Sequence, residues 1–171
     1  MIAQTGTHAR GGDSSTPAGQ PFLDATLMEF IMTFDLSKFD TATLADKGAP
    51  INIVSPLGDV VIGSDGNPIQ FFVLGQDSKK FKADISEARR QAQAQTKTNN
   101  KKTKSPEEED AEAIVRIAGY TVGWTNNFEL DGDKFPFSQE NAVKLYSDAR
   151  FQWIYEQINR QIMNRANFLQ A

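Results

Sequence analysis

The C-terminal run from Phe135 to Leu169 limits what this chain can fold into, because it carries two apolar stripes at helical spacing. The first stripe comprises Ala142, Leu145, Tyr146, Ala149 and Trp153. The second comprises Phe151, Ile154, Tyr155, Ile158 and Ile162. At about 100° per residue the two stripes lie roughly half a turn apart. Either one helix is apolar on both sides, or the chain bends near Asp148–Arg150 and forms two helices. We favour the bend.

Two opposed stripes give more apolar surface than one small core requires. One stripe would face the core of the chain itself and leave the other for a client or for self-association. We therefore predict a partner-binding face made of Ile154, Ile158, Ile162, Phe168 and Leu169. The last two of these residues have two interpretations: they fold back over the core as a lid, or they offer a partner an anchor.

Residues 32–78 are predicted to form a β-rich subdomain. Short apolar runs at 51–54, 60–62 and 69–74 are separated by clusters of Gly, Pro, Asp and Asn. This rhythm predicts a three-stranded antiparallel β-meander. The third run is apolar at both alternating sets of positions, so we expect its strand to be central or covered on both faces. A sheet this small needs helices packed against it.

Residues 79–171 are predicted to form a helical subdomain. Ser78 can cap a first helix, and Ser105 with Glu108 forms a capping box before a second, more apolar helix. A polar loop is expected between these helices at 93–104. With the C-terminal helices, the pattern predicts an α+β fold in which the meander is followed by about four packed helices. Residues 1–31 are expected to form a disordered or partly helical extension.

Residue usage excludes several kinds of chemistry. The chain has no cysteine, and its single histidine, His8, lies in a segment rich in Gly, Ser and Thr. Disulfides and thiolate metal sites are therefore excluded, and a histidine base is not expected. The glycines form neither a phosphate loop nor a dinucleotide fingerprint. We expect no enzymatic activity, no catalytic residue, no cofactor and no metal.

Charge and hydropathy limit the partners. The net charge of −4 gives no electrostatic case for nucleic acid, and we interpret the lysines between 97 and 104 as a solvated loop. No apolar run approaches the roughly 18 residues that a membrane span needs. The N-terminal residues lack the continuous apolar core of a secretion signal. We therefore expect no nucleic-acid partner, no membrane partner and a cytoplasmic location.

A succession of short motifs runs from about Met32 to the end of the chain. Its front half consists of Phe34-Asp35-Leu36, Gly48, Pro56-Leu57-Gly58, Asp65-Gly66 and Val73–Ser78. Its back half consists of Val122-Gly123-Trp124, Phe135–Ala142, Trp153–Ile158 and Asn167-Phe168-Leu169. In order and spacing, this succession resembles the tail assembly chaperones of long-tailed, siphovirus-type bacteriophages. Residues 1–31 lie outside the resemblance.

The resemblance implies a protein that coats the long, helical, aggregation-prone tape measure protein until tail tube subunits polymerise around it. Its partners would be the tape measure protein and the tail tube protein. It would act in the host cell cytoplasm and be absent from the mature virion. The alternative is a structural virion component of the tail or neck, such as a tail terminator or connector-like subunit. That protein would also be small, α+β and non-enzymatic.

Overall fold

The computed structural model describes residues 35–97 and 104–169, with side chains described at all of these except 95–97. The chain divides into two units, Met1–Phe34 and Asp35–Ala171, and every described residue belongs to the second. The expected extension at 1–31 therefore lies outside the described residues. So do residues 98–103 of the expected polar loop.

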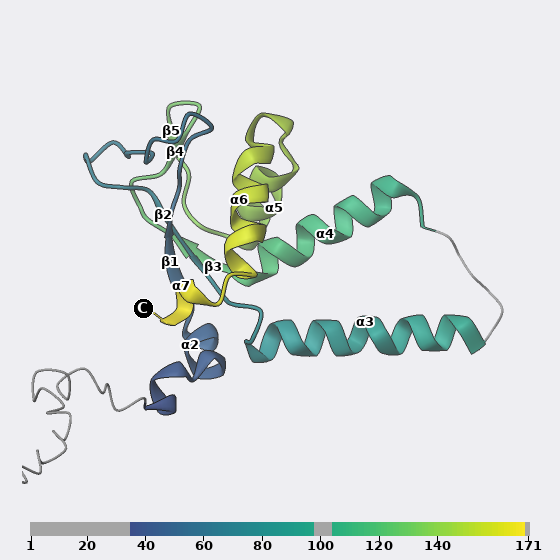
Figure 1. Ribbon diagram of the computed structural model, residues 1–171. Coiled ribbons are helices and arrows are strands. Elements are labelled where there is room, and N and C mark those ends of the chain that lie inside the picture. The colour runs from purple at the N-terminus through teal and green to yellow at the C-terminus, as the bar shows by residue number, and fades with distance from the viewer. Residues whose placement is uncertain (1–34, 98–103, 170–171) are drawn as a thin grey trace, which may run out of the picture. The chain divides into compact units, whose positions relative to one another are not determined.

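A three-stranded antiparallel sheet lies beside the helices, as the predicted α+β class requires (Figure 1). Its strands are β1 (Ala49–Asn52), β2 (Gln70–Val73) and β3 (Thr121–Trp124), in that order across the sheet. On the buried face, Phe71 of β2 lies opposite Ile51 on one side and Trp124 on the other. The strand from the third apolar run, β2, is central, which confirms that prediction.

The second predicted strand, 60–62, is not a strand of this sheet, and β3 occupies the third position instead. Val61 donates its N–H to the Ile53 carbonyl at 2.8 Å and accepts from the Ile69 N–H at 2.9 Å. Only isolated bridges flank this contact among the described residues of the segment. The assignment of 60–62 to the sheet was therefore wrong, although the number of strands was right.

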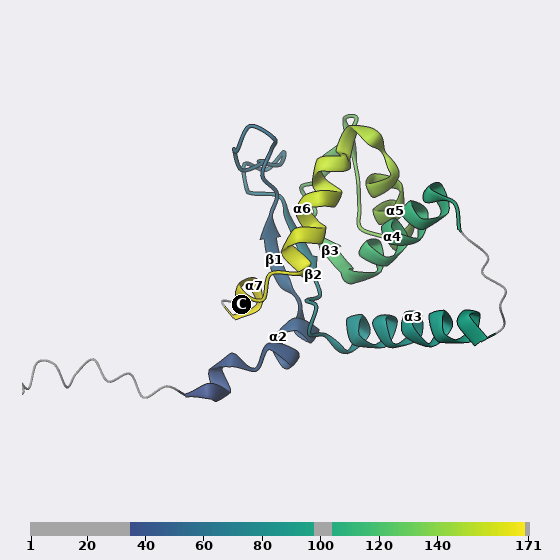
Figure 2. The same ribbon diagram turned by 45° about the vertical axis from the view of Figure 1, so that its right-hand side comes forward.

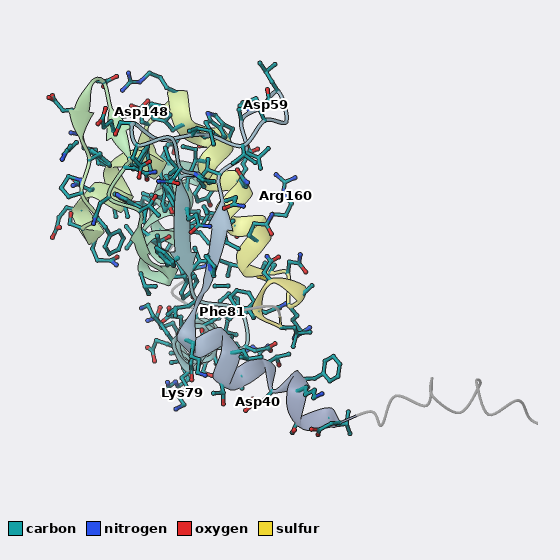
Figure 3. All side chains as sticks on the ribbon, turned by 90° about the vertical axis from the view of Figure 1, so that its left-hand side faces the viewer. Asp40, Asp59, Lys79, Phe81, Asp148 and Arg160 are labelled. Atoms are coloured by element: carbon teal, nitrogen blue, oxygen red, sulfur yellow. The ribbon has the colours of Figure 1, made fainter. Side chains whose placement is uncertain are left out.

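We call residues 53–69 the looped connection. The sequence of this segment explains why residues 60–62 pair with their neighbours only through single bridges. Gly66 turns at φ +78°, and Pro68 has no N–H to donate to a ladder. The pairing therefore breaks after single bridges. Asp59 lies at the outer end of this connection (Figure 3). The looped connection joins β1 to β2 and stands beside the helical layer (Figure 1).

Helices make up most of the remaining described chain. They are α2 (Thr41–Lys47), α3 (Lys79–Lys97), α4 (Pro106–Tyr120), α5 (Gln139–Ser147), α6 (Gln152–Ile162) and α7 (Ala166–Leu169). Short 3-10 turns η1 (Leu36–Phe39) and η2 (Ala149–Phe151) precede α2 and α6, and strands β4 (Glu129–Leu130) and β5 (Asp133–Lys134) form a hairpin. Helix α3 continues to Lys97, so it includes the start of the loop predicted at 93–104.

Two predicted helix boundaries are confirmed by hydrogen bonds. The Glu108 N–H donates to Ser105 Oγ at 3.2 Å, and the Ser105 N–H donates to Glu108 Oε2 at 3.0 Å, which completes the capping box of α4. The C-terminal run bends where we expected. Helix α5 ends at Ser147, and Asp148 accepts from the Arg150 N–H at 2.9 Å to start the 3-10 turn before α6.

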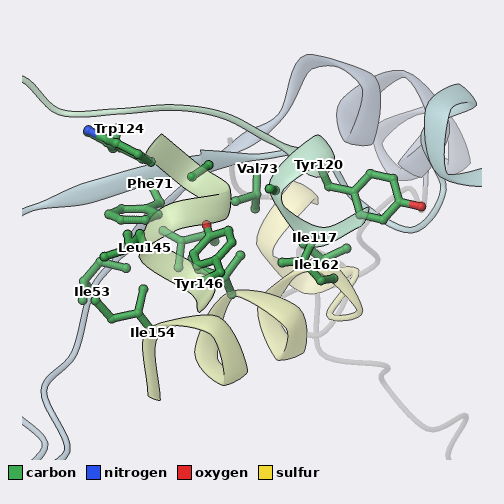
Figure 4. Close-up of a cluster of buried hydrophobic side chains, with 14 of the residues drawn as sticks. Ile53, Phe71, Val73, Ile117, Tyr120, Trp124, Leu145, Tyr146, Ile154 and Ile162 are labelled. Atoms are coloured by element: carbon green, nitrogen blue, oxygen red, sulfur yellow. The ribbon is translucent and has the colours of Figure 1, made fainter. Parts of the chain in front are cut away.

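The core lies between one face of the sheet and helices α4, α5 and α6 (Figures 2 and 4). The sheet contributes Phe71, Val73 and Trp124, and α4 contributes Ile117. Each C-terminal helix buries one stripe. Helix α5 buries Ala142, Leu145 and Tyr146, and helix α6 buries Ile154, Ile158 and Ile162. The opposite side of α6 is exposed, with Arg160 pointing away from the sheet (Figure 3).

Candidate functional site

The residues predicted as a partner-binding face lie inside the fold. Ile154, Ile158, Ile162 and Phe168 are all buried, and Leu169 is partly buried. They stabilise the core and present no exposed apolar face in this structure. The reason is the bend, since stripes half a turn apart oppose each other only along one continuous helix. The 3-10 turn reorients α6, so the α5 residues of the first stripe and the three isoleucines of the second face the same core, whereas Ala149 is exposed.

An apolar groove of about 440 Å³ lies elsewhere, where a partner could reach it. We call it the hairpin groove, because the looped connection, the segment 127–130 and the start of α6 form its walls. Its large apolar lining residues are Ile53, Val61, Ile62, Ile69, Phe71, Phe128, Leu130, Phe151, Trp153 and Ile154. Of the predicted set, only Ile154 lines this groove.

Aromatic packing fixes the inner wall of the hairpin groove. The rings of Phe71 and Phe128 have centroids 5.7 Å apart, and both contact Trp124 behind them, at 5.1 and 5.7 Å. Trp124 is anchored in turn, because its Nε1–H donates to the Phe135 carbonyl at 2.6 Å. Offset and edge-to-face ring pairs of this kind are favourable beyond their buried area. The wall is therefore a preformed surface.

The rim of the groove exposes aliphatic side chains on the looped connection. Ile62, which lines the groove, is 53% exposed, and Val60 beside it is 42% exposed. Leu57, further out on the same connection, is 90% exposed. Single exposed apolar residues are ordinary, but three on one short connection beside an apolar groove favour an interaction site. The rim extends the apolar surface of the groove outward.

One buried amide interrupts the apolar lining. Asn127 is 8% exposed and lines the hairpin groove, and its Nδ2 donates to Asp65 Oδ1 at 2.6 Å and to the Asn67 carbonyl at 3.0 Å. Its Oδ1 has no hydrogen-bond partner among the described residues. A buried acceptor without a donor is unfavourable by about 1–3 kcal/mol.

Asp65 ties the looped connection to Asn127. Besides the Asn127 amide, it accepts from the Asn67 N–H at 2.9 Å and from Asn67 Nδ2 at 3.0 Å. These hydrogen bonds, those from Asn67 first, lower the pKa of Asp65 to about 2. The carboxylate therefore stays ionised and holds two walls of the groove together at neutral pH.

The arrangement is suited to binding. The groove offers apolar contact area with few polar groups, which is typical of a site that binds an apolar segment. No cluster of three or more His, Cys, Asp or Glu suited to a metal ion occurs within 35–97 and 104–169. Among the helices of these same residues, none is both long enough and apolar enough for a membrane crossing.

Sequence reasoning missed the groove for a specific reason. The turn at Asp65-Gly66-Asn67-Pro68 was recognised, but residues 60–62 were assigned to a sheet strand. If residues 60–62 formed a sheet strand, Ile62 would pack against a neighbouring strand. Its exposure was therefore not predicted. The pairing of Asp65 with Asn127, 62 residues apart, leaves no local signal in the sequence.

Comparison with known proteins identifies the family. The model of the YdaY prophage protein family matches residues 76–171, more than half of the chain. The chain belongs to this family. It is thus a prophage protein with an α+β fold. No curated protein matches the chain, and no solved structure does.

The YdaY match divides the hairpin groove. It starts at Gln76 and includes α3 to α7 with β3, so the wall made of segment 127–130 and the start of α6 lies inside it. The looped connection and strands β1 and β2 precede it. The groove in this YdaY-family chain therefore combines family residues with residues that the family model does not match.

Proposed function

We propose that this YdaY-family protein is a phage tail assembly chaperone that binds and solubilises the tape measure protein and helps recruit tail tube subunits. The observation that carries the proposal is the hairpin groove, with its preformed aromatic wall and exposed aliphatic rim. It acts by binding and catalyses no reaction. Membership of a prophage family and the resemblance of the motif order to tail assembly chaperones support the same function.

The chemistry of the groove fits a helical client. An amphipathic helix binds a groove through apolar anchors spaced three or four residues apart. Phe128 and Phe151 supply aromatic surface for such anchors, and Ile62 lies at the rim where a helix would cross. A chaperone needs reversible contacts of this kind, and a preformed groove lowers their entropic cost.

Co-expression with the tape measure protein of the same prophage tests the proposal. The wild-type chain should increase the soluble fraction of the tape measure protein and be captured with it. Ile62→Asp should abolish both effects while leaving the fold intact, because Ile62 is half exposed. Met163→Asp is the matched control. Met163 is also apolar, is 49% exposed and lies outside the groove. The role of the groove would be contradicted if both variants lost solubilisation and capture equally, or if neither variant lost them.

Virion composition separates this function from the structural alternative. An assembly chaperone leaves before the particle is complete, so mass spectrometry of virions purified after prophage induction should not detect the chain. A tail terminator or connector-like subunit would be present at a fixed ratio to the tube protein. Detection at such a ratio would overturn the chaperone proposal in favour of a structural role.

A further inference from the structure

Helix α3 is exposed along most of its described length. Its start packs on the end of α4, where the rings of Phe81 and Tyr120 have centroids 5.1 Å apart. From Ser86 to Ala94, however, every residue is exposed. Figures 1 and 2 show that α3 and α4 diverge from the start of α3 toward its end. Most of α3 thus has little contact with the core.

A helix in this situation is only marginally stable, because helices owe most of their stability to packing of an apolar face. Such a face exists on α3. Ile85 and Ala88 lie three residues apart on one side of the helix, and Lys82 and Arg89 border that side. We call these four residues the α3 face. The small side chain of Ala88 would allow another helix to approach closely.

A complementary strip lies on α4. Ala111 and Val115 are four residues apart and exposed, and Val115 is 57% exposed. Glu108 and Glu112 border them on the same side of the helix. We call these four residues the α4 seam. A shallow hollow of about 410 Å³ lies over Ala111, Glu112, Val115 and Arg116.

The two helices carry opposite charge. Residues 79–94 of α3 contain five Lys or Arg and two acidic residues, whereas α4 contains five acidic residues and Arg116. The α3 face therefore has an apolar centre with a basic border. The α4 seam has an apolar centre bordered by Glu108 and by Glu112, whose carboxylate pairs with Lys104 of the same chain. Opposed charges at an interface steer association and set which surfaces pair.

We propose that the α3 face of one copy packs on the α4 seam of a second copy, so that the chain forms a two-fold symmetric dimer. Two-fold symmetry creates the α3–α4 contact twice, once in each direction. It also places the basic border of one copy against the acidic border of the other. Within one chain, Phe81 and Lys80 reach α4 at its last turn, and the seam at Ala111 and Val115 stays exposed.

This inference does not rest on the proposed chaperone function. The α3 face and the α4 seam share no residue with the hairpin groove. A dimer formed through α3 and α4 would leave the hairpin groove of each copy accessible to a client. Failure of client binding would leave the dimer proposal intact, and failure of dimerisation would leave the groove proposal intact.

A charge-exchange experiment tests the dimer with the full chain. Sedimentation equilibrium should show a concentration-dependent monomer–dimer equilibrium for the wild-type chain. Arg89→Glu alone and Glu112→Arg alone should each raise the dissociation constant roughly tenfold or more, because each places like charges together twice. An equimolar mixture of the two variants should dimerise again, since a mixed dimer has opposite charges at both contacts.

Arg90→Glu is the matched control. It makes the same charge change one residue further along α3, on a side that points about 100° away from Arg89. Its dissociation constant should stay within about twofold of wild type. A wild-type chain that is monomeric at every concentration overturns the proposal. So does a mixture that fails to recover the dimer, which would indicate that α3 closes on the α4 of its own chain.

Discussion

The ring of Phe168 lies directly against Gly75. A Cβ atom added at Gly75 would come within 2.8 Å of the Phe168 ring and within 2.9 Å of the Ala45 side chain. Phe168 itself is 1% exposed. Of the two interpretations of the C-terminal residues, the structure therefore supports the lid, because α7 places Phe168 in the core against the end of β2.

Phe168 and Gly75 should be energetically coupled. Phe168→Ala should lower the free energy of unfolding by about 3–5 kcal/mol, because it leaves a cavity at a fully buried site. Gly75→Ala should lower it by about 1–3 kcal/mol, because the new methyl group overlaps the ring. The double variant should lose clearly less than the sum, since the methyl group occupies space that the ring has left. Urea denaturation measures all three, and additive losses would contradict the contact.

Gln157 should protect the outer edge of β1. Its Oε1 accepts from the Val54 N–H at 3.2 Å, and its Nε2 donates to the Asn52 carbonyl at 3.1 Å. Gln157→Leu should lower the free energy of unfolding by about 1–3 kcal/mol, because both backbone groups lose their partner. Gln139→Leu is the control on the other edge, where one bond of 3.1 Å reaches the Thr121 carbonyl. Denaturation curves should show the smaller loss for that variant. The reverse order would contradict the edge role.

Acid should loosen the looped connection through Asp65. The folded pKa of about 2 lies below the ordinary value of 3.8, so ionised Asp65 stabilises the fold. That stabilisation is fully present above about pH 4 and disappears as the pH falls toward about 2. Thermal melts of wild type and Asp65→Asn should therefore differ most near neutrality and converge in acid. A difference that is constant from about pH 6 to about pH 2 would show that the carboxylate charge is not responsible.

Local patterns in the sequence predicted the parts of the fold that have local causes. The capping box at Ser105, the bend at Asp148 and the central strand β2 each depend on side chains within a few residues, and all were predicted. The third strand of the sheet, β3, was not predicted. Thr121 to Trp124 directly follow a helix, and only pairing with Phe71 and Phe72, about 50 residues earlier, makes this segment a strand.

The partner-binding surface was harder to predict, because exposure is a property of the whole fold. The stripe at Ile154, Ile158 and Ile162 was correctly recognised as the apolar side of a helix. Whether an apolar side faces the core or a partner depends on the direction of the helix after the bend. The hairpin groove depends on three segments that meet only in the folded chain.

Ile158→Asp should unfold the chain, although the sequence predicted Ile158 to be part of a partner-binding face. Ile158 is fully buried on the inner side of α6, and an unpaired carboxylate there would be disfavoured by several kcal/mol. Typical domains have a total stability of about 5–15 kcal/mol, so the loss would be a large part of it. Near-UV circular dichroism should show lost tertiary structure.

Asn159→Asp provides the matched comparison for Ile158→Asp. It introduces the same charge one residue later, on the exposed side of α6, and should leave the spectrum and the melting temperature close to wild type. A pull-down with Ile158→Asp would then report loss of the fold, whereas Ile62→Asp would report loss of the groove surface. An Ile158→Asp chain with a native spectrum would place the inner side of α6 outside the core and restore that side as a candidate partner face.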